Sequence, residues 1–206
     1  MDLSQFFDFP KDVKESITEE ILLQQWMEQI SHYMHKEDNV IWVSDLIRCK
    51  KKAELSNKHF YVFKPEPYFV MANLIHIGLQ KWLQDSYGYE IEKEFEKKIE
   101  EFVIRGRVDA IDSNTVIEIK CTKDVKDNKP YEHHVLQLRL YLWLTGREHG
   151  KLIYITPNKL LEFDIHETMD DDEVLLLIDN WKSPRYEWEC SYCDFACICN
   201  QAVVRR

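Results

Sequence analysis

Two acidic residues on one predicted β-hairpin are the residues of this chain best placed to do chemistry. The segment Gly106-Arg-Val-Asp-Ala-Ile-Asp-Ser-Asn-Thr-Val-Ile-Glu-Ile-Lys120 alternates apolar and charged residues around a polar turn. A turn at Ser113-Asn114, whether it is a two-residue turn or the tip of a four-residue loop, places Asp109 directly opposite Glu118. Like charges so placed repel each other, and a divalent cation removes the penalty by taking both carboxylates as oxygen ligands. The pair predicts a metal site.

The same alternation assigns the two faces of the hairpin. One face is predicted to be core, with Val108, Ala110, Ile117, Ile119 and Cys121, and the other carries Arg107, Asp109, Glu118 and Lys120. An alternative needs no metal, because diagonal ion pairs from Asp109 to Lys120 and from Glu118 to Arg107 would make this a solvated face. A three-residue loop would instead turn Asp109 to the apolar face. The hairpin alone leaves these alternatives open.

Four thiols lie close together in the C-terminal segment, at Cys190, Cys193, Cys197 and Cys199. Four thiolates hold either tetrahedral zinc or an iron-sulfur cluster, because soft sulfur suits both. Cys197 and Cys199 are separated by one residue, so ligation of one centre by both is awkward, and Cys49 is the candidate for a ligand from elsewhere. Buried or idle thiols are the alternative. Cys121 is assigned to the core.

Three more polar residues lie on predicted helices. His76 lies in the middle of a helix predicted over about 68–86, where a lone histidine is more often structural than a ligand. Gln137 and Tyr141 lie four residues apart in a helix predicted over about 131–145 and therefore share a face. Such pairs are common, so only the company of the other motifs gives these residues weight.

The elements that position these residues mix helices with strands. Helical spacing predicts further helices over about 12–35 and 169–182, and a short helix that Ser44 caps and that carries Arg48 and Cys49. Strands are predicted over 90–101, within 102–121, and near 151–156 and 160–165. With no repeat or linker, we expect one α/β domain over 1–206, with a helical part (1–88), a catalytic sheet and helix (89–168), and a C-terminal helix and cysteine tail (169–206).

Composition narrows the class of protein. The 206 residues carry 27 basic and 37 acidic side chains and a formal net charge of −10, which argues against coating nucleic acid by bulk electrostatics but permits a local basic groove. No secretory h-region opens the chain and no apolar run approaches membrane-spanning length. We therefore expect a cytoplasmic protein without membrane contact, in which six cysteines favour metal ligation over disulfides.

The motifs in order resemble the RecB-like branch of the PD-(D/E)xK nucleases: His76, Asp109, Glu118-Ile119-Lys120 and Gln137-x-x-x-Tyr141, flanked by Cys49 and the C-terminal cysteines. More narrowly, residues from about 44 to 199 resemble the CRISPR-associated iron-sulfur exonucleases, the fourth Cas protein family. That family's C-x2-C-x5-C pattern falls on Cys190, Cys193 and Cys199, and leaves Cys197 as the spare. The chain departs from the family at Lys50-Lys51 and Ala72-Asn73, which puts local geometry in doubt and removes no ligand.

The resemblance implies a fold and a set of ligands. The fold is a PD-(D/E)xK core of mixed sheet flanked by helices, whose N-terminal helical part and cysteine-rich tail are joined by an iron-sulfur cluster. A [4Fe-4S] cluster, more than [2Fe-2S], is implied on Cys49, Cys190, Cys193 and Cys199. Mg²⁺ or Mn²⁺ is implied on His76, Asp109, Glu118 and the Ile119 carbonyl. Lys120 would orient the attacking water and stabilise developing charge, while Gln137 and Tyr141 would hold the lysine or the DNA backbone.

The resemblance also implies a function: a deoxyribonuclease that degrades single-stranded DNA from 5′ to 3′ and trims ends before they are integrated as CRISPR spacers, with integrase proteins as partners. A RecB-like nuclease of recombination or viral origin would use the same residues. A second class is a non-catalytic iron-sulfur module that binds DNA. The classes differ at Asp109 and Glu118, because a binding module should tolerate alanine there.

Overall fold

A six-stranded mixed sheet is the frame of the computed structural model, which describes residues 17–34, 37, 39–59 and 66–203. Its strands are β1 (Val40–Trp42), β2 (Glu90–Ile99), β3 (Phe102–Ile111), β4 (Thr115–Cys121), β5 (His149–Ile155) and β6 (Leu160–Ile165). β1 with β3 and β4 with β5 are parallel pairs, and the other pairs are antiparallel. The expected α/β fold with a mixed sheet is confirmed.

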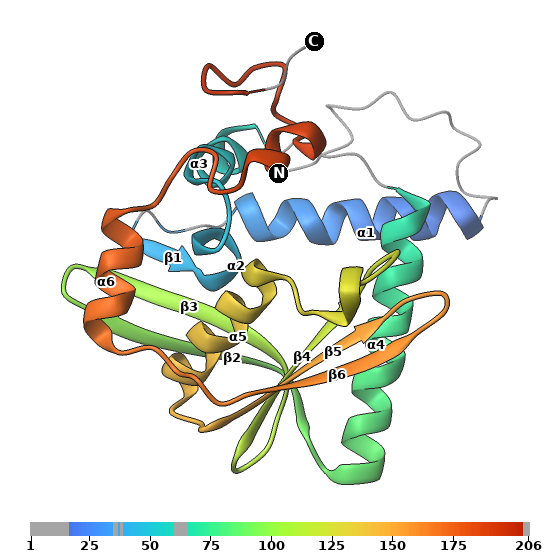
Figure 1. Cartoon of the computed structure of the whole chain (residues 1–206). Helices are drawn as coiled ribbons and strands as arrows, with labels where there is room; N and C mark the ends of the chain where they lie inside the picture. The colour runs from blue at the N-terminus through green and yellow to red at the C-terminus, as the bar shows by residue number, and fades with distance from the viewer. Residues whose placement is uncertain (1–16, 35–36, 38, 60–65, 204–206) are drawn as a thin grey trace.

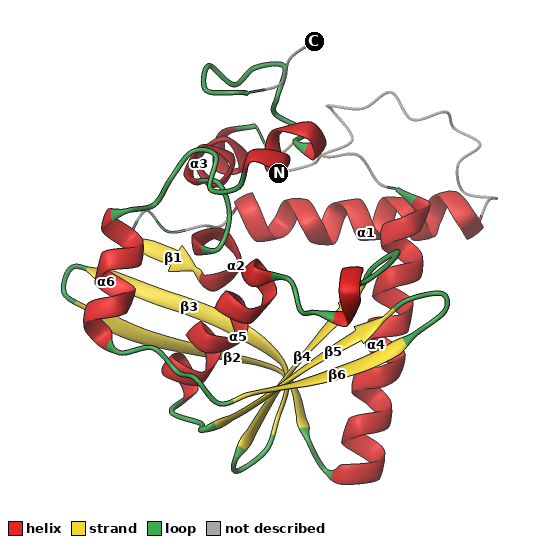
Figure 2. Cartoon of the chain, in the orientation of Figure 1, coloured by secondary structure: helices red, strands yellow, loops and turns green. Residues whose placement is uncertain are grey.

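Helices cover both faces of this sheet (Figures 1 and 2). They are α1 (Ile17–Met34), α2 (Val43–Leu46), α3 (Lys50–Lys58), α4 (Pro67–Tyr87), α5 (Glu132–Thr145) and α6 (Asp171–Asp179), with 3₁₀ turns η4 (Lys126–Asn128) and η5 (Glu187–Tyr192). The main core lies under α5 and α6, and a smaller apolar cluster lies under α4. Among the described residues, none of these helices is both long and apolar enough to span a bilayer.

The long helices begin and end where local chemistry dictates. α4 and α5 each end at a glycine in the left-handed conformation, Gly88 (φ 75°) and Gly146 (φ 68°). Asp170 and Glu173 form a capping box at the start of α6. These helices confirm the three that the sequence predicts in this region. The predicted first helix is confirmed over Ile17–Met34, and its remaining positions, 12–16 and 35, lie outside the described residues.

The prediction for the segment before Cys49 is wrong. Ser44 lies inside the short helix α2, whose N-cap is Trp42, so it caps nothing. Arg48 and Cys49 follow that helix instead of lying within it, and Cys49 is the N-cap of α3, a helix that was not predicted. Ser44 was chosen on residue type alone, and the N-cap lies two residues earlier, at Trp42, the last residue of β1 that pairs with β3.

The turn between β3 and β4 confirms the predicted register. Ala110 pairs with Ile117 and Ile111 with Val116, which aligns Asp109 with Glu118. The side chain of Asp112 fixes the turn, because its Oδ1 accepts hydrogen bonds from the backbone amides of Asn114 (2.8 Å) and Thr115 (2.6 Å).

The predicted face of Val108 is wrong, because the alternation of β3 breaks at Asp109. Val108 is buried in the main core under α5, whereas Ala110 packs with Leu83 of α4 on the other face. The neighbouring strand β2 is irregular at the same level. Its pairing with β3 skips Glu92, which has a positive φ of 52°. The side chain of Asp109 therefore lies where β3 changes the face that it presents.

Candidate active site

Asp109 lies where β3 changes its partner strand along one edge, from β1 to β4. Along the other edge β3 pairs with β2 on both sides of Asp109, while along this edge it pairs with β1 only as far as Arg105 and with β4 only from Ala110. Between those points the edge is open. Across this opening, Asp109 Oδ2 accepts a hydrogen bond of 2.6 Å from the backbone amide of Ile119 on β4.

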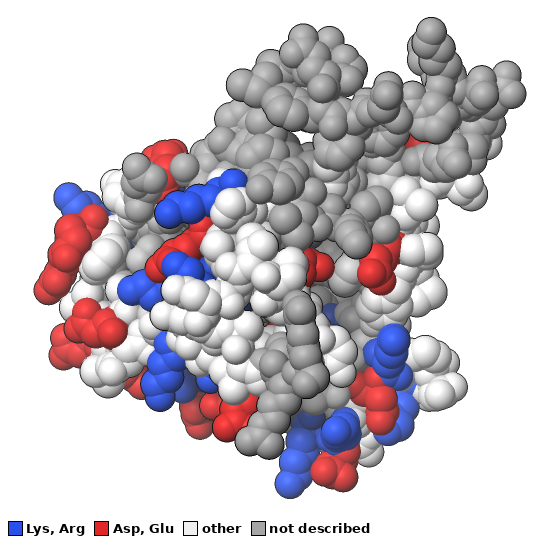
Figure 3. All heavy atoms as spheres, turned by 90° about the horizontal axis from the view of Figure 1, so that it is seen from above, with Lys and Arg blue, Asp and Glu red and all other residues white. Residues whose placement is uncertain are grey.

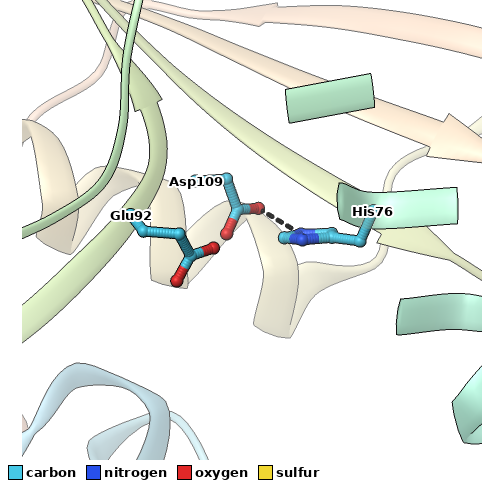
Figure 4. Close-up of side chains that lie close together, drawn as sticks. All are labelled: His76, Glu92 and Asp109. Carbon is cyan, nitrogen blue, oxygen red and sulfur yellow. Dashed lines mark ion pairs between the residues drawn. The ribbon is translucent and has the colours of Figure 1, made fainter. Parts of the chain in front are cut away.

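A histidine from α4 and a glutamate from β2 join Asp109 (Figure 4). His76 Nε2 lies 2.9 Å from Asp109 Oδ2, and the ligand atoms of His76, Asp109 and Glu92 all lie within 4.8 Å of one another. Burial of the imidazole disfavours its charge, but the hydrogen bond and charge of Asp109 outweigh that effect, so the pKa of His76 is raised. One imidazole and two carboxylates form a donor set that suits Mn²⁺ or Mg²⁺.

Sequence reasoning missed Glu92 as a member of this group. It lies in the run Glu90-Ile-Glu-Lys-Glu-Phe-Glu-Lys-Lys98, which is typical of a solvated strand face. Only its place opposite Asp109, at the irregular point of β2, distinguishes it from its neighbours. Its carboxylate accepts a short hydrogen bond from the Gln80 amide and pairs with Arg107 Nε at 2.7 Å.

Glu118 is the buried carboxylate of the site. Its side chain is 3% exposed, Oε1 pairs with Lys120 Nζ at 2.5 Å, and Oε2 has no hydrogen-bond partner among the described residues. Burial raises its pKa to about 7, the charge of Asp109 adds to the rise, and Lys120 opposes it. Glu118 does not belong to the group of ligand atoms within 4.8 Å, because its carboxylate is turned toward the lysine.

A hydrogen-bonded chain runs from Lys120 into helix α5. Lys120 Nζ donates to Gln137 Oε1 (2.8 Å), and Gln137 Nε2 donates to the Tyr141 hydroxyl (3.1 Å). Burial raises the pKa of Tyr141 well above its usual range. The helix approaches this closely because residue 106 is glycine, since a Cβ there would lie 2.7 Å from Tyr141 Cε1. The structure thus brings together Lys120, Gln137 and Tyr141.

The diagonal ion pairs of the solvated-face alternative do not form. Arg107 pairs with Glu92 and Lys120 pairs with Glu118 along its own strand. The alternative also needs an exposed face, whereas Glu118 is buried.

A cysteine-lined cavity lies apart from these residues, between α3 and the C-terminal segment. It measures about 360 Å³ including its open part, and four thiols line it: Cys49, Cys190, Cys193 and Cys199. Cys197 is exposed and outside that lining. Cys121 lies elsewhere, with its thiol directed at the Ala72 carbonyl of α4. The four thiols of the cavity are those that the resemblance implies.

Glu189, also missed in the sequence, fastens this cavity together. Its buried carboxylate accepts the Cys49 amide on Oε1 (2.8 Å) and the Arg185 and Tyr186 amides on Oε2 (2.8 and 2.9 Å). A carboxylate with three backbone donors is well satisfied despite burial. It joins the N-terminus of α3 to the segment that carries the other thiols.

Comparison with known proteins places this geometry in a family. The model of the PD-(D/E)XK nuclease superfamily matches residues 22–200. The chain is 35% identical over 199 residues to the CRISPR-associated exonuclease Cas4 of Saccharolobus solfataricus, covering 89% of this chain and 97% of that protein. The crystal structure of SSO0001 matches with a TM-score of 0.86 at 34% identity, over 93% of this chain and 100% of that one.

A more distant likeness concerns the fold alone. LHK-Exo, an alkaline exonuclease from Laribacter hongkongensis, matches with a TM-score of 0.53 at 13% identity, over 74% of this chain and 87% of that one.

Proposed function

Because the chain belongs to the PD-(D/E)XK nuclease superfamily, and within it to the family of the CRISPR-associated exonuclease Cas4, we propose that it is a Mg²⁺- or Mn²⁺-dependent deoxyribonuclease. The observation that carries the proposal is Glu118, a buried carboxylate with one oxygen unpartnered among the described residues. It lies on the strand beside Asp109 and is ion-paired with Lys120.

The residues present fit a divalent cation. An unpartnered buried oxygen is costly, and a cation would satisfy it. His76, Asp109 and Glu118 would hold the ion with the Ile119 carbonyl, and Glu92 adds a carboxylate on the opposite side of Asp109. When bound, the ion would activate water and polarise the scissile phosphate.

The other residues hold the reacting groups in place. Lys120 is a cation positioned by Glu118 and Gln137, so it can orient a water and stabilise the negative charge that develops on the phosphate. Gln137 is in turn fixed by Tyr141. A rigid second layer of this kind keeps the lysine in a productive position.

An iron-sulfur cluster fits the four thiols of the cysteine-lined cavity. Cys49, Cys190, Cys193 and Cys199 line the cavity together, as the family resemblance implies for its cluster ligands. In a [4Fe-4S] centre each thiolate would bind a different iron, and the centre would have a structural role.

The relatives suggest the substrate and the pathway. We propose that the enzyme degrades single-stranded DNA from 5′ to 3′, and that it trims ends in the cytoplasm for CRISPR spacer acquisition together with integrase proteins. The name of the Saccharolobus relative, a CRISPR-associated exonuclease, supports the exonuclease activity and the association with CRISPR. The single-stranded substrate, the polarity and the integrase partners rest on the family resemblance.

The test is cleavage of end-labelled single-stranded DNA by anaerobically purified protein, with the visible absorption spectrum recorded on each sample. We expect Glu118→Gln to lose activity about a hundredfold or more at equal absorbance. Glu94→Gln, an exposed glutamate on β2, is the matched control and should cleave as wild type does. Blocking the 5′ end should stop degradation and blocking the 3′ end should not.

The proposal would be contradicted if wild type and Glu118→Gln bound DNA equally well and wild type cleaved it neither in Mg²⁺ nor in Mn²⁺. The hairpin carboxylates would then be structural, and the protein would be an iron-sulfur module that binds DNA.

A further inference from the structure

A hollow beside the candidate active site contains aromatic and basic side chains that no role described so far uses. It encloses about 660 Å³, including the part open to solvent, and Lys120 and Gln137 form one end of it. Its other lining residues come from the segment between α2 and α3, the start of α3, the first turns of α5, and η5 with the residue before it. The hollow therefore borders the candidate active site at Lys120 and the cysteine-lined cavity at Glu189.

Three rings gather on one wall of this hollow. Tyr186 and Trp188 stack with an interplanar angle of 13° and a centroid distance of 5.8 Å, and the His133 ring lies 5.2 Å from that of Trp188. Trp188 nevertheless keeps 48% of its surface exposed. Burial lowers the pKa of His133 to about 4, with Lys120 and Arg48 adding to the effect, so this ring is neutral at physiological pH. A rigid, half-exposed aromatic platform of this kind is a typical surface for a nucleobase.

Two further basic side chains line the hollow. They are Arg48 and Lys52, and neither takes part in an ion pair among the described residues. Elsewhere charges are mixed: on the face shown in Figure 3, basic and acidic side chains are interspersed without one extended basic surface. On a chain with a net charge of −10, a confined pair of cations beside Lys120 is a local attraction for a phosphate backbone.

We propose that this hollow, the stacking pocket, holds the unpaired nucleotide next to the scissile phosphate, with its base on Trp188 and its phosphates at Arg48 and Lys52. The assignment rests on the proposed nuclease function and names the substrate class of that site. A base can reach Trp188 only after it leaves a helical stack, so the stacking pocket selects single-stranded over duplex ends. Because every base offers a π face, the selection is tolerant of sequence.

Glu189 makes the stacking pocket depend on the cysteine-lined cavity. This residue lines both, and its carboxylate ties the Tyr186 amide to the Cys49 amide. The Glu189 carboxylate therefore holds both the aromatic platform and the backbone of Cys49, whose thiol lines the cysteine-lined cavity.

The test measures binding without cleavage, by fluorescence anisotropy of a labelled oligo-dT in Ca²⁺. Stacking by one aromatic residue contributes about 1–3 kcal/mol, so Trp188→Ala should weaken binding roughly 5- to 100-fold, and Trp188→Phe should restore most of it. The matched control is Trp82→Ala on α4, whose side chain is 51% exposed and outside the stacking pocket. Arg48→Ala should lower the slope of log K against log salt by about 0.7.

An abasic nucleotide, placed at successive positions from the end, tests the contact from the DNA side. At one position it should weaken binding to wild type by the same factor as Trp188→Ala, and it should add nothing to that variant. The stacking pocket would be overturned if the abasic nucleotide and Trp188→Ala weakened binding additively at every position. It would also be overturned if both Trp188 variants bound DNA as tightly as wild type, at unchanged visible absorbance. Cleavage by those variants would leave the nuclease function standing, whereas no cleavage by wild type would remove the function itself.

Discussion

At the residue scale, the proposed chemistry depends on a carboxyl group that folding buries. Burial removes Glu118 from water. One of its carboxylate oxygens pairs with Lys120, and the other has no hydrogen-bond partner among the described residues. Such a residue costs stability wherever it is charged and unneutralised. Its burial is therefore a feature of function, in which the fold holds an anion that a cation can neutralise.

This cost predicts the pH dependence of metal-free stability. The pKa of Glu118 is raised from 4.5 to about 7 in the folded protein, so the folded state binds its proton more tightly than the unfolded state does. The resulting stabilisation is present below pH 4.5 and is lost as the pH rises through 7. Thermal unfolding of EDTA-treated wild type should therefore occur at a lower temperature at pH 8 than at pH 5.5.

Glu118→Gln isolates this effect, because other groups, including His76, titrate in the same range. The variant should unfold at a higher temperature than wild type at pH 8, and this difference in unfolding temperature should shrink at pH 5.5. Addition of Mn²⁺ at pH 8 should raise the unfolding temperature of wild type more than that of the variant. A difference that does not change with pH would contradict the assignment.

The residues themselves were predictable to different degrees. Asp109, Glu118 and Lys120 were predictable because a short alternating hairpin places them by local rules. Glu92 and Glu189 were not, because each is a glutamate in an acidic neighbourhood whose role depends on a distant partner, Asp109 for one and the Cys49 amide for the other.

At the element scale, strand β3 is what opens the site. It has three partner strands, and the gap between β1 and β4 on one edge lies at Asp109. The turn after β3 was predictable, since Asp112 forms it from its own side chain. The change of face at Val108 was not, because it depends on the pairing of β3 with β2 and β4 at once.

The irregular point of β2 leads to a second prediction. Glu92→Gln removes a negative charge from the group that contains His76 and Asp109, and keeps the side chain's size. We expect Mn²⁺ affinity, measured by calorimetry, to fall about 10- to 100-fold, with a smaller loss of activity than in Glu118→Gln. Glu94→Gln, two residues along the same strand, should match wild type. Unchanged Mn²⁺ affinity in Glu92→Gln would show that the carboxylate serves only its contacts with Arg107 and Gln80.

At the scale of the whole molecule, segments distant in sequence meet at the cysteine-lined cavity. Cys49 stands between α2 and α3, and the other three thiols lie beyond α6, after the whole sheet. The identity of these thiols was predictable from the family pattern. Their convergence around Glu189 was not, because a buried carboxylate with three amide donors leaves no periodic pattern in the sequence.

Two conservative substitutions separate a ligand from a spare thiol. Cys193→Ser should abolish the visible absorbance of the anaerobic protein and lower its unfolding temperature by several degrees, because the metal centre contributes to folding. It should also make the segment after α6 sensitive to limited proteolysis. Cys197→Ser, at the exposed thiol, should retain the absorbance and resist the protease like wild type. Equal loss of absorbance in both variants would mean that Cys197 is a ligand.

The position of Cys49 has a consequence for biosynthesis. The ribosome makes this thiol before five of the six strands of the sheet, β2 to β6, and makes its three companions only after β6 and α6 are complete. A nascent chain that stops within those strands thus contains only one of the four thiols that line the cavity, and cannot complete that lining. A metal centre that needs all four thiols would then assemble only in chains that already contain every residue of the candidate active site.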